Sequence, residues 1–209
     1  MSTVLSWLGF GPPRTTGALR GGDSPPLNIW IIRRDGTERP AKPVRVGAFR
    51  SPIFAHDPTH VYAIQNSNIV DINTRDDAPP KEMRWPRPQD PPRLILGRGP
   101  ASTAAIAVMT AGAIVLTVTP STGASSTLAS GLSPDDTATL TRQLGFCGGW
   151  VVYEGEQKGP GLTTRTDVFI RKDGQKLGTV LTSAWPGSAH GQPSFSADCE
   201  KIVFVSDDK

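Results

Sequence analysis

The chain has 209 residues and carries 22 Lys and Arg against 19 Asp and Glu, a formal net charge of +3. No stretch is densely basic, which argues against the footprint expected of a nucleic-acid-binding protein. Gly (22) and Pro (20) together make up about a fifth of the residues, a composition that favours many turns and little helix. We therefore expect one all-β domain with a substantial buried core.

The first segment, 1–27, has no basic stretch ahead of an apolar core and reaches Gly-Pro-Pro by residue 13, so it does not read as a secretory signal. We expect a flexible leader over 1–27, a folded domain over 28–209 and a cytoplasmic location. The periplasm is the alternative if a signal has been removed. Trp7 and Phe10 make the leader a candidate for docking on a partner or on the domain itself.

Residues 28–44, NIWIIRRDGTERPAKPV, predict a strand, a tight turn and a returning strand. Asp35-Gly36 between apolar runs is a strong hairpin signal, because the turn needs positive φ and Gly supplies it without steric cost.

Residues 51–64, SPIFAHDPTHVYAI, predict a strand, a polar turn and a second strand. His56, Asp57 and His60 lie in that turn, and two His at i and i+4 with a carboxylate could in principle hold a metal ion. The same turn recurs near the C-terminus without the histidines, so we favour a structural turn and expect no metal site.

Residues 76–93, DDAPPKEMRWPRPQDPPR, contain six prolines and predict a long loop outside any strand ladder. Trp85, flanked by Arg84 and Arg87, suggests a polyproline-like recognition segment with an exposed aromatic ring. The alternative is a linker that folds over the sheet. The apolar run at 104–119 is too short to cross a bilayer and predicts two buried strands and a turn.

The sequence has two cysteines, Cys147 and Cys199. Two are too few for a fold held together by several disulfides, and their spacing is not that of a zinc site. We expect free, partly buried thiols. His190 has no serine elbow or triad order around it that would recommend it as a catalytic base.

Two kinds of segment repeat along the chain. TDVFIRKDGQKLGTVLT at 166–182 matches the hairpin at 28–44, and QPSFSADCEKIVFVS at 192–206 matches 51–64. In the second match Pro52 aligns with Pro193, Phe54 with Phe195 and Asp57 with Asp198. Two hairpins in series give a four-stranded meander, and meanders repeated every ~40–50 residues are typical of β-propellers.

The segment PSFSADCEKIVFVSDD at 193–208, with Leu181-Thr182 ahead of it, resembles the TolB-like, WD40-like (PD40) β-propeller repeat. The chain departs from that repeat at Ala197-Asp198-Cys199, where the family has Pro-Asp-Gly. The resemblance covers about half of the chain and implies a propeller. The chain starts with an outer half-unit and finishes with an inner one, so we expect strands from both ends to complete one blade.

That pairing would close a small ring of about four antiparallel four-stranded blades, the others lying within 51–80, 91–132 and 138–180. A partial larger propeller is the alternative, because family members commonly have six blades.

We predict a non-catalytic protein-protein interaction module. The specific hypothesis is a bacterial adaptor or inhibitor that sequesters a partner protein. We expect no cofactor, metal, membrane or direct nucleic-acid contact, and a monomer before the partner binds. The alternatives are a propeller-type hydrolase or lactonase, the propeller of a serine peptidase, and a periplasmic TolB-like envelope component. The predicted partner-binding residues are Trp85, Arg84, Arg87, Trp7, Phe10 and Trp185.

Overall fold

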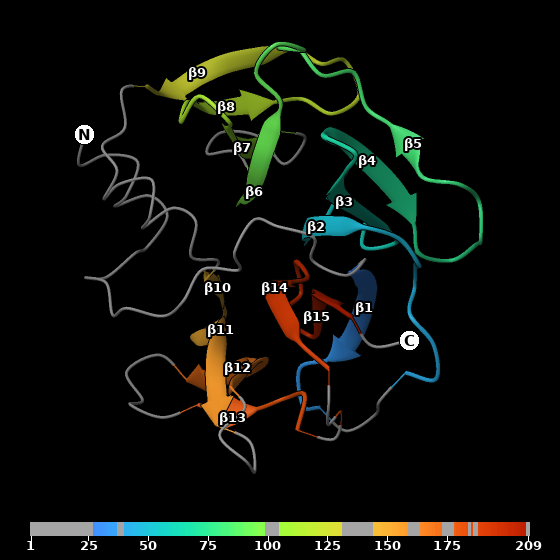
Figure 1. Ribbon diagram of the computed structural model, residues 1–209, viewed down its shortest axis with the longest axis vertical. Coiled ribbons are helices and arrows are strands. Elements are labelled where there is room, and N and C mark those ends of the chain that lie inside the picture. The colour runs from blue at the N-terminus through green and yellow to red at the C-terminus, as the bar shows by residue number, and fades with distance from the viewer. Residues whose placement is uncertain are drawn as a thin grey trace. The chain divides into compact units, whose positions relative to one another are not determined.

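In a computed structural model of the chain, the described residues form only strands, turns and irregular segments. The described ranges are 27–36, 40–98, 105–130, 144–158, 164–172, 178–183, 185 and 188–207. They hold fifteen strands in four antiparallel sheets (Figure 1). The all-β prediction is confirmed.

The chain packs as two compact units. The described residues of the first lie within Ile53–Arg142, and those of the second lie within Arg14–Pro52 and Gln143–Lys209. Each unit has its own apolar core, and each is described below by itself.

The first unit contains two four-stranded meanders. Sheet B has the order β2(Phe49–Phe54), β3(His60–Gln65), β4(Asn68–Asn73) and β5(Lys81–Glu82), with the first residues of β2 belonging to the other unit. Sheet C has the order β6(Pro92–Arg98), β7(Ile106–Thr110), β8(Val115–Val118) and β9(Ser125–Ala129). Branched aliphatic side chains from both sheets form the core: Ile53, Ile64, Ile69, Ile95, Ile106, Val108, Leu116 and Val118.

Two expectations for this unit have clear outcomes. The run 104–119 does form two strands, β7 and β8, joined by a turn. The prediction that 76–93 stays outside the ladders was wrong, because Lys81 and Glu82 pair with β4 and Pro92 opens β6 opposite Thr110. A proline lacks only the donor, so it is tolerated at the first position of a strand.

The second unit contains sheets D and A. Sheet D has the order β10(Leu144–Cys147), β11(Trp150–Lys158), β12(Thr164–Lys172) and β13(Thr179–Val180). Sheet A has the order β1(Asn28–Arg33), β15(Lys201–Ser206) and β14(His190–Phe195). Aromatic and aliphatic side chains from both sheets share one core: Trp30, Ile32, Val152, Val168, Ile170, Trp185, Phe195, Ile202 and Phe204.

Strands from opposite ends of the sequence pair in sheet A, as predicted. β1 runs antiparallel to β15 from Asn28 opposite Ser206 to Arg33 opposite Lys201. Figure 1 shows blue β1 beside red β15. The predicted return of the chain after Asp35-Gly36 is reduced to a single bridge between Ile29 and Arg45, whereas β12 and β13 form the corresponding hairpin in sheet D.

The repeat predicted from 51–64 and 192–206 is confirmed in its hydrogen bonds. Ala55 N–H donates to His60 C=O at 2.9 Å, and Ser196 N–H donates to Lys201 C=O at the same distance. Inside each turn the aspartate accepts from the backbone N–H two residues later, which is the bond that makes an Asx turn.

Candidate functional site

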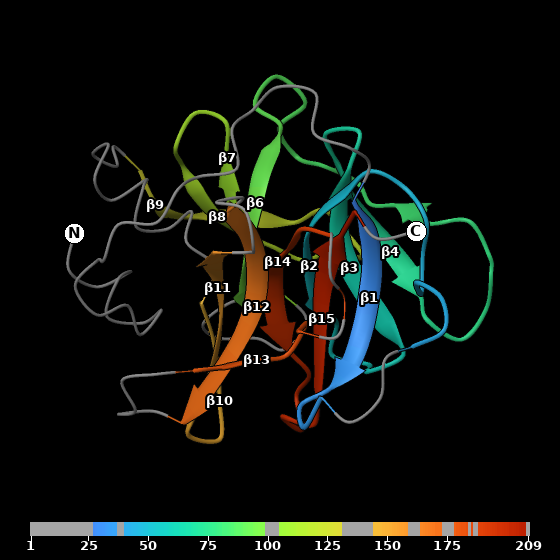
Figure 2. The ribbon, with the colours of Figure 1, turned by 60° about the horizontal axis from the view of Figure 1, so that its bottom comes forward.

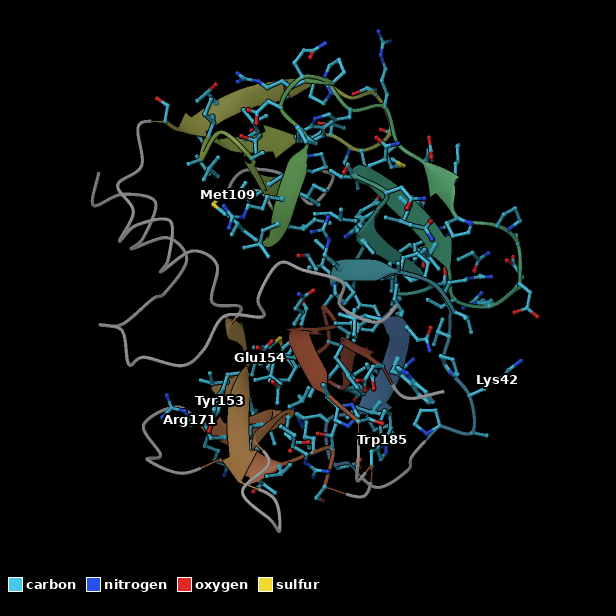
Figure 3. All side chains as sticks on the ribbon, in the orientation of Figure 1. Lys42, Met109, Tyr153, Glu154, Arg171 and Trp185 are labelled. Carbon is cyan, nitrogen blue, oxygen red and sulfur yellow. A yellow bond between two sulfur atoms is a disulfide. The ribbon has the colours of Figure 1, made fainter. Side chains whose placement is uncertain are left out.

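The most unusual polar group of the second unit is the Glu154 carboxyl on β11, which points toward β14 of sheet A (Figure 3). Gln192 N–H donates to Glu154 Oε2 at 3.1 Å. Burial raises the pKa of Glu154 above its ordinary value, and this hydrogen bond opposes the rise in part. Gly191 makes room for the carboxylate, because a β-carbon at that position would overlap Glu154 Oε2.

Two strained residues accompany this carboxyl. Ser51 and Gln192 have φ of 51° and 56°, a left-handed conformation that non-glycine residues seldom adopt. Ser51 N–H donates to the side-chain oxygen of Gln192, which ties the two residues together. The Ser51 hydroxyl is buried and has no hydrogen-bond partner among the described residues. Strained backbone and a carboxyl of raised pKa are features that gather at functional sites.

Sequence reasoning missed this cluster, although one signal was present. Ser51 and Gln192 occupy the same repeat position, each directly before the proline of the aligned Pro52 and Pro193 pair. Glu154 carried no such signal, because its burial depends on the packing of sheet D against β14.

A second polar cluster lies on β12 of the same sheet, next to β11. Asp167 is fully buried and accepts from Arg165 Nε at 2.8 Å and from the Thr182 hydroxyl at 2.8 Å. The Thr182 oxygen in turn accepts from Val168 N–H at 3.2 Å. These bonds satisfy a carboxylate that would otherwise be costly to bury, so the cluster has a structural role.

His190 lies inside the aromatic core. It is 1% exposed and makes edge contacts with the rings of Trp185 and Phe204 at centroid distances of 5.2 and 5.9 Å. A nearby cavity of about 20 Å³ has room for about one water molecule, which is too small for a substrate. Its lining residues are Leu27, Thr166, Ala189, His190, Gly191 and Val205.

The turn at 56–60 is held by hydrogen bonds of its own. Asp57 accepts from Thr59 N–H and from the Thr59 hydroxyl, and these bonds lower the pKa of the exposed Asp57 carboxyl. His60 Nδ1 lies 2.7 Å from Asp71 Oδ1 on β4. Within the described ranges, no group of three or more His, Cys, Asp or Glu is arranged to hold a metal ion.

Trp85 folds back onto the first unit. Its ring is half-buried against the core of sheets B and C, and its Nε1 donates to the backbone carbonyls of Arg87 at 2.7 Å and Asp90 at 3.1 Å. This arrangement fits the alternative of a linker that covers the sheet. Arg84 is exposed and Arg87 is half-buried, and their predicted partner contacts stay predictions.

The other predicted partner-binding residues differ in their placement. Trp185 is 3% exposed and packs against Trp30 at a centroid distance of 4.7 Å, so the structure gives its ring a place in the core. Trp7 and Phe10 lie outside the described residues.

The expectation of free thiols was wrong, because Cys147 and Cys199 form a disulfide. Cys147 ends β10, and Cys199 lies in the turn between β14 and β15, so the bond joins sheets D and A. Cys147-Gly148-Gly149-Trp150 is a two-residue hairpin turn with φ of 54° and 75° at the glycines. Fifty-two residues separate the two cysteines, and spacing alone does not reveal such a bond.

Figure 3 also shows Tyr153 and Arg171 near one another on sheet D. Tyr153 stacks on Phe169 at 5.4 Å, and the Arg171 guanidinium lies 5.8 Å from the Tyr153 ring centre. Gly155 leaves room for this stack, because a β-carbon there would come within 2.9 Å of the Phe169 ring.

The described part of the chain contains no helix that is long and apolar enough to span a membrane.

Comparisons with known proteins give little. No family model matches the chain, and no curated protein matches it. Among solved structures, the chain is similar to a protein of Agrobacterium tumefaciens assigned as TolB, with 16% sequence identity and a TM-score of 0.44. The match covers 84% of this chain and 60% of the Agrobacterium chain, so this chain spans less than two thirds of that protein's length.

Proposed function

We propose that the chain is a small TolB-like β-propeller that acts as a non-catalytic protein-protein interaction module. The pairing of β1 with β15 carries this proposal, because a blade built from both ends of a chain is how a propeller ring can be closed. The matching Asx turns at Asp57 and Asp198 support a repeated blade unit. In this proposal sheets A, B, C and D are the four blades.

The proposed ring of blades is better suited to binding a partner than to catalysing a reaction. Propellers present loops on a rigid scaffold, and binding residues are often found on such loops. The buried side chains of Asp167 and Thr182 bond to each other and hold one sheet together. The remaining candidate, Glu154, faces the backbone of β14.

The disulfide favours an oxidising compartment over the cytoplasm that the sequence led us to expect, because cytosolic thiols are usually kept reduced. We therefore place the module in the periplasm or outside the cell. Cell fractionation under thiol-blocking conditions, followed by peptide mass spectrometry of Cys147 and Cys199, tests this placement. Recovery of the native protein with both thiols free would contradict it.

The proposed fold is tested by size-exclusion chromatography with light scattering on the oxidised 209-residue chain. A compact monomer is expected for a closed ring. An obligate oligomer or an aggregate would mean that sheet edges are open and that the chain is part of a larger propeller.

The proposed role is tested by affinity capture from the native extract, with Arg84→Glu as the test variant and Arg50→Glu as the control, since both side chains are exposed. The expected result is one protein retained in a fixed ratio by wild type and by the control. Failure of the folded wild-type monomer to retain any protein would count against an interaction module. Retention by Arg84→Glu equal to wild type would remove Arg84 from the binding surface.

A further inference from the structure

The last strands of sheets B, C and D differ in how their outer edges are protected. β5 and β13 have two residues each, and both residues of β5, Lys81 and Glu82, are charged. β9 has five residues, and none of them is charged. Proteins usually keep an exposed edge short or charged, because its backbone groups otherwise accept another strand. β9 therefore lacks the protection that β5 and β13 have.

The uncharged character extends well beyond β9. Residues 99–134 contain no Lys, Arg, Asp or Glu, and Ser125, Ser126 and Thr127 of β9 are exposed. β9 lies beside β8 at the margin of sheet C in both views (Figure 1 and Figure 2). The edge of sheet C thus carries neutral hydroxyl side chains at positions where edge strands commonly carry charges.

Two residues of β9 direct their backbone groups away from β8. Where β8 leads into β9, Thr119 N–H donates to Ala124 C=O at 2.8 Å. Backbone groups alternate in direction along an antiparallel strand, so Ser126, two residues after Ala124, also bonds to β8. The N–H and C=O of Ser125 and of Thr127 therefore point outward, away from sheet C.

These outward groups can accept a further strand. Among the described residues nothing pairs with β9 on this side. The bulge in the pairing of β9 with β8 comes after Thr127, so Ser125 and Thr127 both lie in regular strand. Two outward residues offer four backbone groups, which is enough for two hydrogen-bonded pairs with one added antiparallel strand.

The face on which the outward residues lie indicates which side chains an added strand would carry. Ser125 and Thr127 are opposite Val118 and Leu116, which are buried in the core of the first unit. Side chains of directly opposite residues lie on the same face of a sheet. Apolar side chains at alternate positions of an added strand would therefore extend this core face at its margin.

A cation without an ion-pair partner lies at the start of β9. Arg84 is exposed and forms no ion pair with the described residues. It borders the turn that leads into β9, because a β-carbon at Gly123 would come within 2.8 Å of Arg84 C=O and within 3.2 Å of Arg84 Cγ. Arg84 is thus positioned to attract a carboxylate at this end of the strand.

We propose that β9 is a docking edge for an extended, uncharged segment of a partner protein that is followed directly by an acidic residue. The segment adds to sheet C as a fifth strand, held by the outward groups of Ser125 and Thr127. Charged side chains along the segment would meet no opposite charge in 99–134. An antiparallel strand places its C-terminal end at the start of β9, so the acidic residue lies beside Arg84. This inference rests on the proposed function and names the surface and the kind of partner.

The test uses the oxidised full chain and a synthetic peptide in which Thr alternates with Val, ending in Glu with an amidated C-terminus and carrying fluorescein at its N-terminus. One matched probe ends in Lys instead of Glu, and another has Pro at its central positions. We expect fluorescence anisotropy to show that the Glu peptide binds at least about tenfold tighter than either control. Hydrogen exchange at the amides of Ser125 and Thr127 should slow when it binds. Absence of protection at both amides would overturn the proposal.

Variants at the edge locate the binding. Thr127→Pro removes an outward N–H without removing a donor to β8, a placement that edge strands tolerate. We expect it to weaken binding of the Glu peptide about tenfold, and Thr127→Val, which keeps the amide, to weaken it by less. Unchanged affinity in a folded Thr127→Pro variant contradicts the proposal.

Arg84→Glu tests the charge at the end of the strand and does not depend on the folding of a proline variant. It should shift preference from the Glu peptide to the Lys peptide. Arg50→Glu, which makes the same change at another exposed arginine, should keep the wild-type preference. If Arg84→Glu causes no shift, the acidic residue of the proposed partner is wrong.

Two outcomes separate this inference from the function on which it rests. If a partner is captured from the extract equally well by wild type and Thr127→Pro, the interaction module stands and the β9 edge is not its binding surface. If light scattering shows a dimer that Thr127→Pro converts to a monomer, the edge is occupied by a second copy of the chain and the proposed partner segment is wrong.

Discussion

Cys199 has a left-handed backbone, with φ of 63°, and its sulfur is bonded to that of Cys147 across 52 residues of sequence. The TolB-like repeat places Gly at the corresponding turn position, where positive φ has no steric cost. A glycine has no side chain to cross-link. With cysteine at this position the backbone is strained, but the side chain can form the disulfide that joins sheets D and A.

Removing this bond should lower the free energy of unfolding by up to about 4 kcal/mol, because an open chain of this loop length has more conformational freedom when unfolded. Urea unfolding of the oxidised and reduced protein measures the difference. The control compares two bond-free variants. Cys147→Ala with Cys199→Gly should be about 1 kcal/mol more stable than Cys147→Ala with Cys199→Ala, since Gly relieves the strain at φ 63°. Equal stabilities would show that the turn is not strained.

Glu154 should make stability depend on pH. Its pKa in the folded protein is raised above the ordinary 4.5, so the folded state holds the proton more tightly than the unfolded state does. The free energy of unfolding should therefore decrease as the pH rises from about 4.5 through the raised pKa, and then level off.

The Glu154→Gln variant should lose this part of the pH dependence and be at least as stable as wild type at neutral pH, because the amide oxygen still accepts from Gln192 N–H. Glu200→Gln, which changes an exposed carboxyl, is the control and should keep the wild-type profile. Urea midpoints between pH 4 and 8 give the comparison. A Glu154→Gln profile parallel to wild type would contradict the assignment.

Trp85 should stabilise the first unit through its packing and its two hydrogen bonds. Trp85→Phe keeps most of the ring but leaves the carbonyls of Arg87 and Asp90 without their donor, at a cost of about 1–2 kcal/mol. Trp85→Ala should cost about 3 kcal/mol because it also opens a gap against the core. Arg84→Ala, at an exposed neighbour, should stay within about 0.5 kcal/mol of wild type. Thermal unfolding distinguishes these cases. If Trp85→Ala were as stable as wild type, the Trp85 ring would not be needed for the stability of the first unit and would be available to a partner.

Asp167 and Thr182, which share a hydrogen bond in sheet D, should show strong energetic coupling. Asp167→Ala removes the partner of Arg165 and of the Thr182 hydroxyl, at an expected cost of about 2–3 kcal/mol. Thr182→Val should cost about 1–2 kcal/mol, and Thr182→Ser, which keeps the hydroxyl, should cost less. The double variant should be less damaging than the sum of the two singles, because they share one bond. Additive effects in urea unfolding would argue that the residues act separately.

Local patterns predicted much of the fold. The alignment of Asp57 with Asp198 placed two turns that share the same hydrogen bonds, and the apolar spacing in 104–119 located β7 and β8. The pairing of β1 with β15 followed from two half-units at opposite ends of the chain. Each of these inferences used residues close together in sequence or a motif that repeats.

The polar cluster and the disulfide could not be predicted in that way. Glu154 meets Gln192, and Cys147 meets Cys199, only after sheets D and A have packed together. The proline-rich stretch was misjudged for a different reason: Lys81 and Glu82, between its prolines, still carry the N–H groups that a ladder needs. Trp85 was expected to be exposed because composition does not show that backbone carbonyls lie within reach of its ring nitrogen.

The pairing of β1 with β15 also means that β1 is synthesised well before the strand that covers it. β1 is made before β15, which follows roughly 170 residues later, a delay of about ten to thirty-five seconds on a ribosome. During that delay Ile29, Trp30 and Ile32, all buried in the finished protein, have no strand to cover them. The nascent chain therefore exposes an aggregation-prone segment until β15 is made, and a chaperone that binds short apolar stretches would have a long opportunity there.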